Sequence, residues 1–62
     1  MKIWEIAYYT TELNYKYGFP LFRETIRCSR YVAVTIAQRR IRNNPLLHYF
    51  DLVGKEDDKQ KF

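Results

Sequence analysis

The stretch SRYVAVTIAQRRIRNNP, residues 29–45, decides the fold, because here the chain leaves the alternation of the preceding residues for a recurrence of every three to four residues. This period predicts an amphipathic helix from Arg30 to about Asn43. The expected buried side holds Ala33, Val34, Ile36, Ala37 and Ile41, and the expected outer side holds Thr35, Gln38, Arg39 and Arg42. A mostly strand-like chain therefore contains one basic helix.

Both ends of this helix carry recognisable signals. The Ser29 hydroxyl can accept a hydrogen bond from an unpaired amide of the first turn, which makes Ser29 the expected N-cap. Asn43 and Asn44 suit a left-handed turn at the other end, and Pro45 disfavours helical backbone in the residue before it. One alternative stays open: residues 30–36 are rich in β-branched side chains and could form a strand.

The chain before and after this helix indicates strands. Lys2 to Leu13 is rich in aromatic and β-branched residues, and Leu21 to Cys28 alternates between two faces. Between them, residues 14–20 contain Asn, Gly and Pro and are expected to form the tip of a hairpin. The apolar run Leu46 to Val53 is expected to be a third strand. The sequence thus predicts an α+β fold in the order β-β-α-β, with a small antiparallel sheet of about three strands covered by one helix.

Length and composition limit the organisation. The 62 residues allow one domain, expected over 1–54, and such a short chain buries only about 60% of its unfolded surface. Residues 55–62 hold three basic and three acidic residues and are expected to be a disordered charged tail. The edges of a three-stranded sheet are often closed by a second copy, so a homodimer is expected.

Cysteine and hydropathy usage point to a cytoplasmic protein without cofactors. Cys28 is the only cysteine, which rules out an internal disulfide, and Cys28 with the lone His48 falls short of the four ligands of a structural zinc site. No metal or other cofactor is therefore expected. The sequence shows neither an apolar run of about 18 to 20 residues nor the apolar core of a signal peptide, so a soluble, cytoplasmic protein is the expectation.

Positive charge is the clearest functional signal. The formal net charge is +4, and all six arginines fall between Arg23 and Arg42. Arginine presents a planar fork of donors suited to phosphates and carboxylates. The candidate binding residues are the arginines of the outer sheet face and of the helix end, together with residues of the expected hairpin tip: Arg23, Arg27, Arg39, Arg40, Arg42, Tyr15, Lys16 and Tyr17.

Three interpretations of this set stay open. Arginines with exposed tyrosines could bind the phosphates of DNA or RNA and stack on its bases. Tyr and Arg are also enriched among the residues that dominate protein–protein interfaces. Finally, arginines at a helix C-terminus offset the helix dipole and keep a small aromatic-rich domain in solution.

The sequence offers only weak candidates for a catalytic site, and no catalytic residue is predicted. Cys28 and His48 could form a nucleophile–base pair only if the third strand neighboured the second in matching register; instead, Cys28 is expected to be a small buried residue and His48 a surface residue on a strand. Glu5 and Glu24 could face each other across the hairpin, but each is expected to pair with an arginine instead. Asp57 and Asp58 lack the spacing of a calcium loop. The protein is therefore not expected to be an enzyme.

The overall plan resembles that of many small phage accessory proteins, including host-takeover and anti-CRISPR proteins. The shared features are a strand that opens near Met1, a hairpin, one helix with a pattern such as Tyr31…Ala33…Ile36-Ala37…Arg40-Ile41, a closing strand and a charged tail. The resemblance implies stoichiometric inhibition of a host nuclease, polymerase or CRISPR surveillance complex in the host cytoplasm. Direct binding of DNA or RNA is the alternative.

Overall fold

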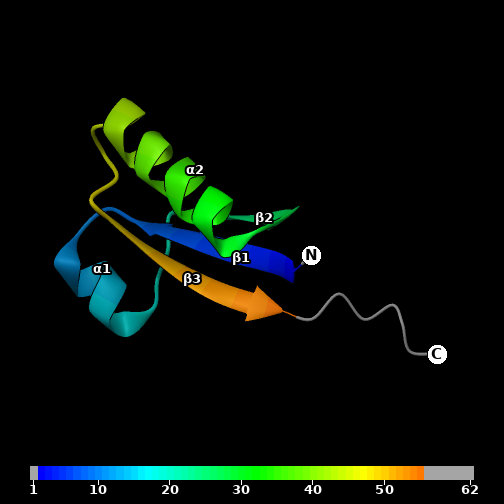
Figure 1. Cartoon of the computed structure of the whole chain (residues 1–62). Coiled ribbons are helices and arrows are strands. Elements are labelled where there is room, and N and C mark those ends of the chain that lie inside the picture. The colour runs from blue at the N-terminus through cyan, green and yellow to red at the C-terminus, as the bar shows by residue number, and fades with distance from the viewer. Residues whose placement is uncertain (1, 56–62) are drawn as a thin grey trace.

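The computed structural model describes residues 2–55 of the chain and contains three strands and two helices (Figure 1). In chain order these are β1 (Lys2–Tyr9), α1 (Glu12–Tyr17), β2 (Phe22–Cys28), α2 (Arg30–Asn43) and β3 (Tyr49–Lys55). The α+β class with a three-stranded antiparallel sheet is confirmed. Lys55 ends β3, and the remainder of the predicted tail lies outside the described residues.

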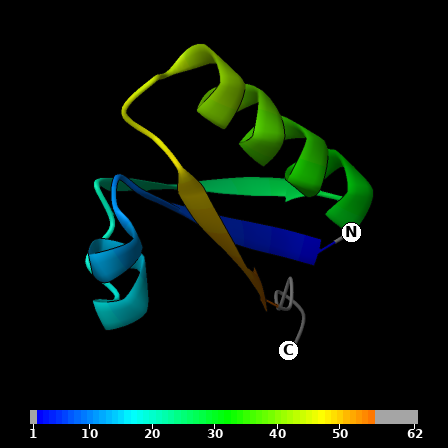
Figure 2. The same ribbon diagram turned by 90° about the vertical axis from the view of Figure 1, so that its left-hand side faces the viewer.

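The first strand of the chain lies in the centre of the sheet, in the order β2-β1-β3. Both neighbours run antiparallel to β1, so β2 and β3 are parallel to each other. Parallel strands need a long crossover, usually a helix, and α2 supplies it by passing over one face of the sheet (Figures 1 and 2). The topology therefore explains why a long helix stands between the second and third strands.

The core lies between this face and α2. Even-numbered residues of β1 point toward the helix, and Ile6 and Tyr8 are fully buried. Ala33 and Ala37 of α2 are also fully buried, and their small side chains let the helix approach the sheet. The cluster also contains Trp4, Cys28 and Leu47, with Ile26, Ile41, Phe50 and Leu52 packed against it.

Among residues 2–55, only α1 covers the odd-numbered side of the sheet, at one end. Figure 2 shows α1 and α2 on opposite sides of the sheet. The ring of Tyr15 makes an edge contact with Tyr9 and stacks on Tyr49, with both centroid distances 5.2 Å. These contacts hold the short helix against the ends of β1 and β3. The rest of this side is called the open face below, and it carries Arg23 and Arg27 of β2.

The expected hairpin tip is wrong, because residues 12–17 form α1 and β1 ends at Tyr9 instead of Leu13. Thr11 caps the helix by accepting a hydrogen bond from the Asn14 amide at 3.1 Å. Gly18 ends it in the left-handed conformation, with φ of 76°, and its amide bonds back to the helix. Capping and the tyrosine contacts thus outweigh the β propensity of this aromatic segment.

The helix predicted at residues 30–43 is confirmed, and the strand alternative for residues 30–36 is wrong. Ser29 is the N-cap and accepts a hydrogen bond from the Val32 amide at 3.3 Å. The predicted left-handed turn is absent: Asn44 is extended, and no non-glycine residue within 2–55 has positive φ. An extended residue is what the following Pro45 requires. The third strand is also shorter than predicted at its start, since β3 begins at Tyr49 rather than Leu46.

Candidate functional site

The eight candidate residues are divided between two sides of the sheet. Arg23 and Arg27 lie on the open face, and Tyr15, Lys16 and Tyr17 lie on α1 at the end of the same side. The remaining three, Arg39, Arg40 and Arg42, belong to the last turns of α2 on the other side. The structure therefore brings together the sheet arginines and the α1 residues at one side, and separates them from the helix arginines.

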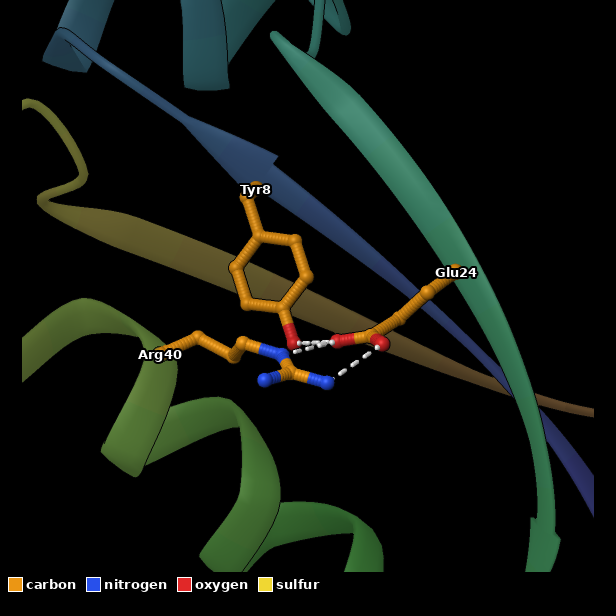
Figure 3. A network of polar contacts seen from close by, with 3 residues as sticks. All are labelled: Tyr8, Glu24 and Arg40. Carbon is orange, nitrogen blue, oxygen red and sulfur yellow. Dashed lines mark hydrogen bonds and ion pairs between the residues drawn. The ribbon is translucent and has the colours of Figure 1, made fainter. Parts of the chain in front are cut away.

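Arg40 belongs to a polar network that joins α2 to the sheet (Figure 3). Its Nε donates to Oε2 of Glu24 at 3.1 Å, and its Nη2 donates to Oε1 at 3.2 Å. The buried Tyr8 hydroxyl donates to Oε2 of the same carboxylate. The Glu24 carboxylate thus accepts from a helix side chain and from a core side chain at once.

The electrostatics of the network follow from these contacts. The hydrogen bond from Arg40, aided by that from Tyr8, lowers the pKa of Glu24 below its ordinary value. Burial, with the neighbouring Glu24 carboxylate, raises the pKa of the Tyr8 hydroxyl. Tyr8 is therefore neutral and Glu24 charged at neutral pH, the states in which Tyr8 donates and Glu24 accepts. The network fixes α2 over the sheet, and it engages Arg40, one of the three candidate arginines of α2, in an internal ion pair.

Exposed apolar side chains gather on and after α1. Leu13 and Tyr17 lie one helical turn apart on α1 and are 62% and 63% exposed. Phe19 and Leu21, in the loop that leads to β2, are 67% and 54% exposed. We call these four residues the apolar segment. Lys16 lies within it and Arg23 follows it, and Glu12 is the carboxylate beside it.

Sequence reasoning missed most of the apolar segment because it expected a hairpin tip there. Only Tyr17 was among the candidates. A helix spanning residues 12–17 places positions 13 and 17 on one face, and the residues that cap this helix, Thr11 and Gly18, are visible in the sequence. That capping pattern was the available signal.

The Cys28 and His48 side chains do not meet. Cys28 is buried opposite Lys2 at the start of β1, whereas the His48 amide bonds to the Tyr9 carbonyl at the end of the same strand. At about 3.3 Å per residue, the length of β1 separates them by roughly 23 Å. The strand order also excludes the arrangement that such a pair requires, because β1 lies between β2 and β3. The prediction that Cys28 is a buried core residue is confirmed. The surface position predicted for His48 is also confirmed, but His48 precedes β3 instead of lying on a strand.

The two glutamates lie on opposite faces of the sheet. Glu24 shares the helix-covered face with Ile6, while Glu5 lies on the open face and pairs with Lys55 at 3.2 Å. The expected pairing with an arginine is confirmed for Glu24 and wrong for Glu5. Within residues 2–55 no three or more metal-binding side chains converge, and no pocket is present. Neither helix in this range is long and apolar enough to cross a membrane.

Comparison with protein-family models, with curated proteins and with solved structures finds no match for this chain.

Proposed function

We propose that this protein is a non-catalytic binding protein that docks on another protein through the apolar segment, Leu13, Tyr17, Phe19 and Leu21. The observation that carries the proposal is the exposure of these side chains, each more than half exposed within nine residues of chain. Contiguous exposed apolar surface on a small domain is typical of interaction sites. Tyrosine and arginine, here Tyr17 and Arg23, are residues that dominate interface energetics.

The segment is held ready for binding. The cap at Thr11, the left-handed Gly18 and the contacts of Tyr15 with Tyr9 and Tyr49 fix α1 before a partner arrives. A surface that is already ordered loses less conformational entropy on association. The charged side chains beside the segment are Lys16, Arg23 and Glu12, so the net charge there is positive. The complementary partner surface is therefore apolar with an acidic rim.

The partner class follows from the architectural resemblance described above. Small phage accessory proteins act by occupying a surface of a host complex that handles nucleic acid. We extend the proposal to such a complex, for example a CRISPR effector, nuclease or polymerase in the host cytoplasm, with the protein acting as a stoichiometric inhibitor.

Affinity capture with matched variants tests the proposal. Immobilised wild-type protein is expected to retain a partner from host lysate, and Tyr17→Ser with Phe19→Ser is expected to lose it. The matched control is Tyr31→Ser with Leu46→Ser, because these two apolar side chains are just as exposed, at 80% and 63%, but lie outside the segment. The captured protein is then purified and its affinity measured by calorimetry. Equal affinity for both double variants would contradict the proposed surface.

Direct binding of DNA or RNA is the second candidate, favoured by one observation. Tyr15 stacks on Tyr49, and both rings remain partly exposed on the side that carries Lys16 and Arg23. Tyrosines near cations are the elements of a base-stacking platform. A gel shift with DNA and RNA at low and physiological salt tests this candidate. Salt-sensitive binding that Lys16→Ala with Arg23→Ala weakens, and Arg39→Ala with Arg42→Ala does not, would place nucleic acid on this side. No shift at low salt would exclude it.

A further inference from the structure

The outer edge of β3 is open. Within residues 2–55, β3 pairs with β1 on one side and with no strand on the other. The side chain of Val53 is 49% exposed on the open face. An edge strand presents unpaired amides and carbonyls and is a template for another strand.

The backbone hydrogen bonds show which residues face this edge. The Leu52 amide donates to Oδ1 of Asp51 at 3.0 Å rather than to a strand. Successive residues of an antiparallel strand direct their amides and carbonyls to opposite edges. Leu52 and Gly54 therefore present these groups outward, while Asp51, Val53 and Lys55 bond toward β1. The side chains of Asp51, Val53 and Lys55 share the open face.

Along β3 these three side chains are acidic, apolar and basic in turn. A second copy that runs antiparallel presents the same three in the opposite order, so each charge faces its opposite. If a second copy of β3 is placed antiparallel with the two Val53 residues opposite each other, Asp51 lies opposite the partner's Lys55, and Lys55 opposite the partner's Asp51. Opposite charges directly across two strands stabilise pairing. In the same register Leu52 lies opposite the partner's Gly54, so the two residues that face the outer edge bond to each other, and the Leu52 amide exchanges its hydrogen bond to Asp51 Oδ1 for one to the partner's Gly54 carbonyl.

We propose that two copies of this protein pair through the edge of β3, antiparallel about Val53, to form a continuous six-stranded sheet. The pairing is isologous, so one set of contacts occurs twice. It brings together two Asp51–Lys55 ion pairs, the two Val53 side chains and the outward backbone groups of Leu52 and Gly54. Lys55 already pairs with Glu5 at 3.2 Å, and in the dimer it lies between two carboxylates. The proposal does not depend on the apolar segment.

The other edge of the sheet does not share this complementarity. Pairing of β2 with its own copy about its central residue, Thr25, sets Arg23 opposite the partner's Arg27 at two places. Like charges directly opposite destabilise a strand pair. The charge pattern therefore selects β3 rather than β2 for the contact between copies.

Sedimentation of charge-reversed variants tests the proposal. The wild-type protein is expected to dimerise as its concentration rises from about 10 μM to about 1 mM, the range of small interfaces. Asp51→Lys alone sets Lys against Lys, and Lys55→Asp alone sets Asp against Asp, so each should weaken self-association at least about tenfold. An equimolar mixture of the two variants restores both ion pairs and should dimerise like the wild type. Arg23→Asp, on the other edge, should leave the wild-type dimer unchanged.

The proposal is overturned if the wild-type protein stays monomeric to about 1 mM, or if the mixture associates no better than its components. Circular dichroism of each variant checks the fold. A second measurement needs no substitution: in a mixed-label wild-type sample, nuclear Overhauser contacts between Val53 methyl groups of different copies are expected. A dimer that lacks these contacts would also overturn the proposed interface.

Discussion

Glu24 and Arg40, which are 16 positions apart, form a two-point ion pair between the edge strand β2 and α2, with nitrogen–oxygen distances of 3.1 and 3.2 Å. The Tyr8 hydroxyl donates to the same carboxylate from the central strand. One carboxylate thus connects three elements that the chain visits at different times. The stability of the protein should therefore respond to each member of this network.

Acid should weaken the fold through Glu24. The pKa of Glu24 is lowered in the folded state, so the unfolded chain binds a proton first as the pH falls. The contribution of the ionised Glu24 carboxylate to the free energy of unfolding is then lost. The contribution is complete above the ordinary pKa of 4.5 and disappears as the pH falls through the lower folded value. Denaturant titrations at several pH values should show a smaller loss of unfolding free energy in Glu24→Gln than in the wild type below pH 4.5. Parallel pH profiles of the two proteins would exclude a role for Glu24 in acid sensitivity.

Removal of the Tyr8 hydroxyl should destabilise the protein with little change in packing. Tyr8→Phe keeps the ring that stacks on Phe22 at 4.7 Å and removes only the donor to Glu24. Hydrogen bonds to charged groups contribute about 1.5 to 3 kcal/mol, so the unfolding free energy should fall by about this amount. Urea denaturation measures it, and Tyr31→Phe, at an exposed position, is the matched control. Equal stability of Tyr8→Phe and wild type would show that the hydroxyl contributes nothing net.

Gly54→Ala should destabilise the sheet because of Trp4. A Cβ at position 54 would lie 2.9 Å from Cζ3 and 3.0 Å from Cη2 of the Trp4 ring, which sits over the glycine opposite it in the sheet. Overpacking of this kind costs about 1 to 3 kcal/mol. The effect should shrink in a Trp4→Leu background, because the ring is then absent. A cost that is the same in both backgrounds would assign it to the backbone of residue 54 instead.

The N-terminus of α2 offers a stabilising change. Ser29 caps the helix, but the first turn holds no acidic residue. Ser29→Asp keeps an oxygen for the Val32 amide and adds a negative charge near the positive end of the helix dipole, so it should raise stability by about 0.3 to 1 kcal/mol. Ser29→Ala should lower it by about 1 kcal/mol. Thermal unfolding of the three proteins at low and high salt measures both effects, and the gain from Asp should shrink in high salt.

The elements with strong local signals could be predicted from the sequence. Ser29 and the apolar period identified α2, and alternation identified β2, each to within a residue. The short helix α1 escaped prediction because Tyr15 and Tyr17 have high β propensity, and the contacts of Tyr15 with Tyr9 and Tyr49 are visible only after folding.

The candidate site was predictable only in its residue types. The clustering of arginines in the chain suggested a contact surface, and alternation correctly assigned Arg23 and Arg27 to the outer sheet face. The structure shows that this face and the end of α2 lie on opposite sides of the sheet. Arg40 forms an ion pair with Glu24 because the register of β2 with β1 places Glu24 beneath α2. This register is a long-range property that no local pattern shows. The exposure of Leu13 and Phe19 likewise depends on α1, which was not predicted from the sequence.

The position of the first strand in the centre of the sheet has a consequence for how the protein is made. Residues of β1 are synthesised before the other four elements, but one of their two neighbours, β3, is synthesised only after α2, with Ile3 pairing with Lys55. Until β3 is present, α2 lacks part of the sheet on which it packs, and the core residues of β1 lack their packing neighbours Phe50 and Leu52. The nascent chain therefore cannot complete its core until β3 has been synthesised. During that interval the half-built sheet is the state most exposed to aggregation and to proteases.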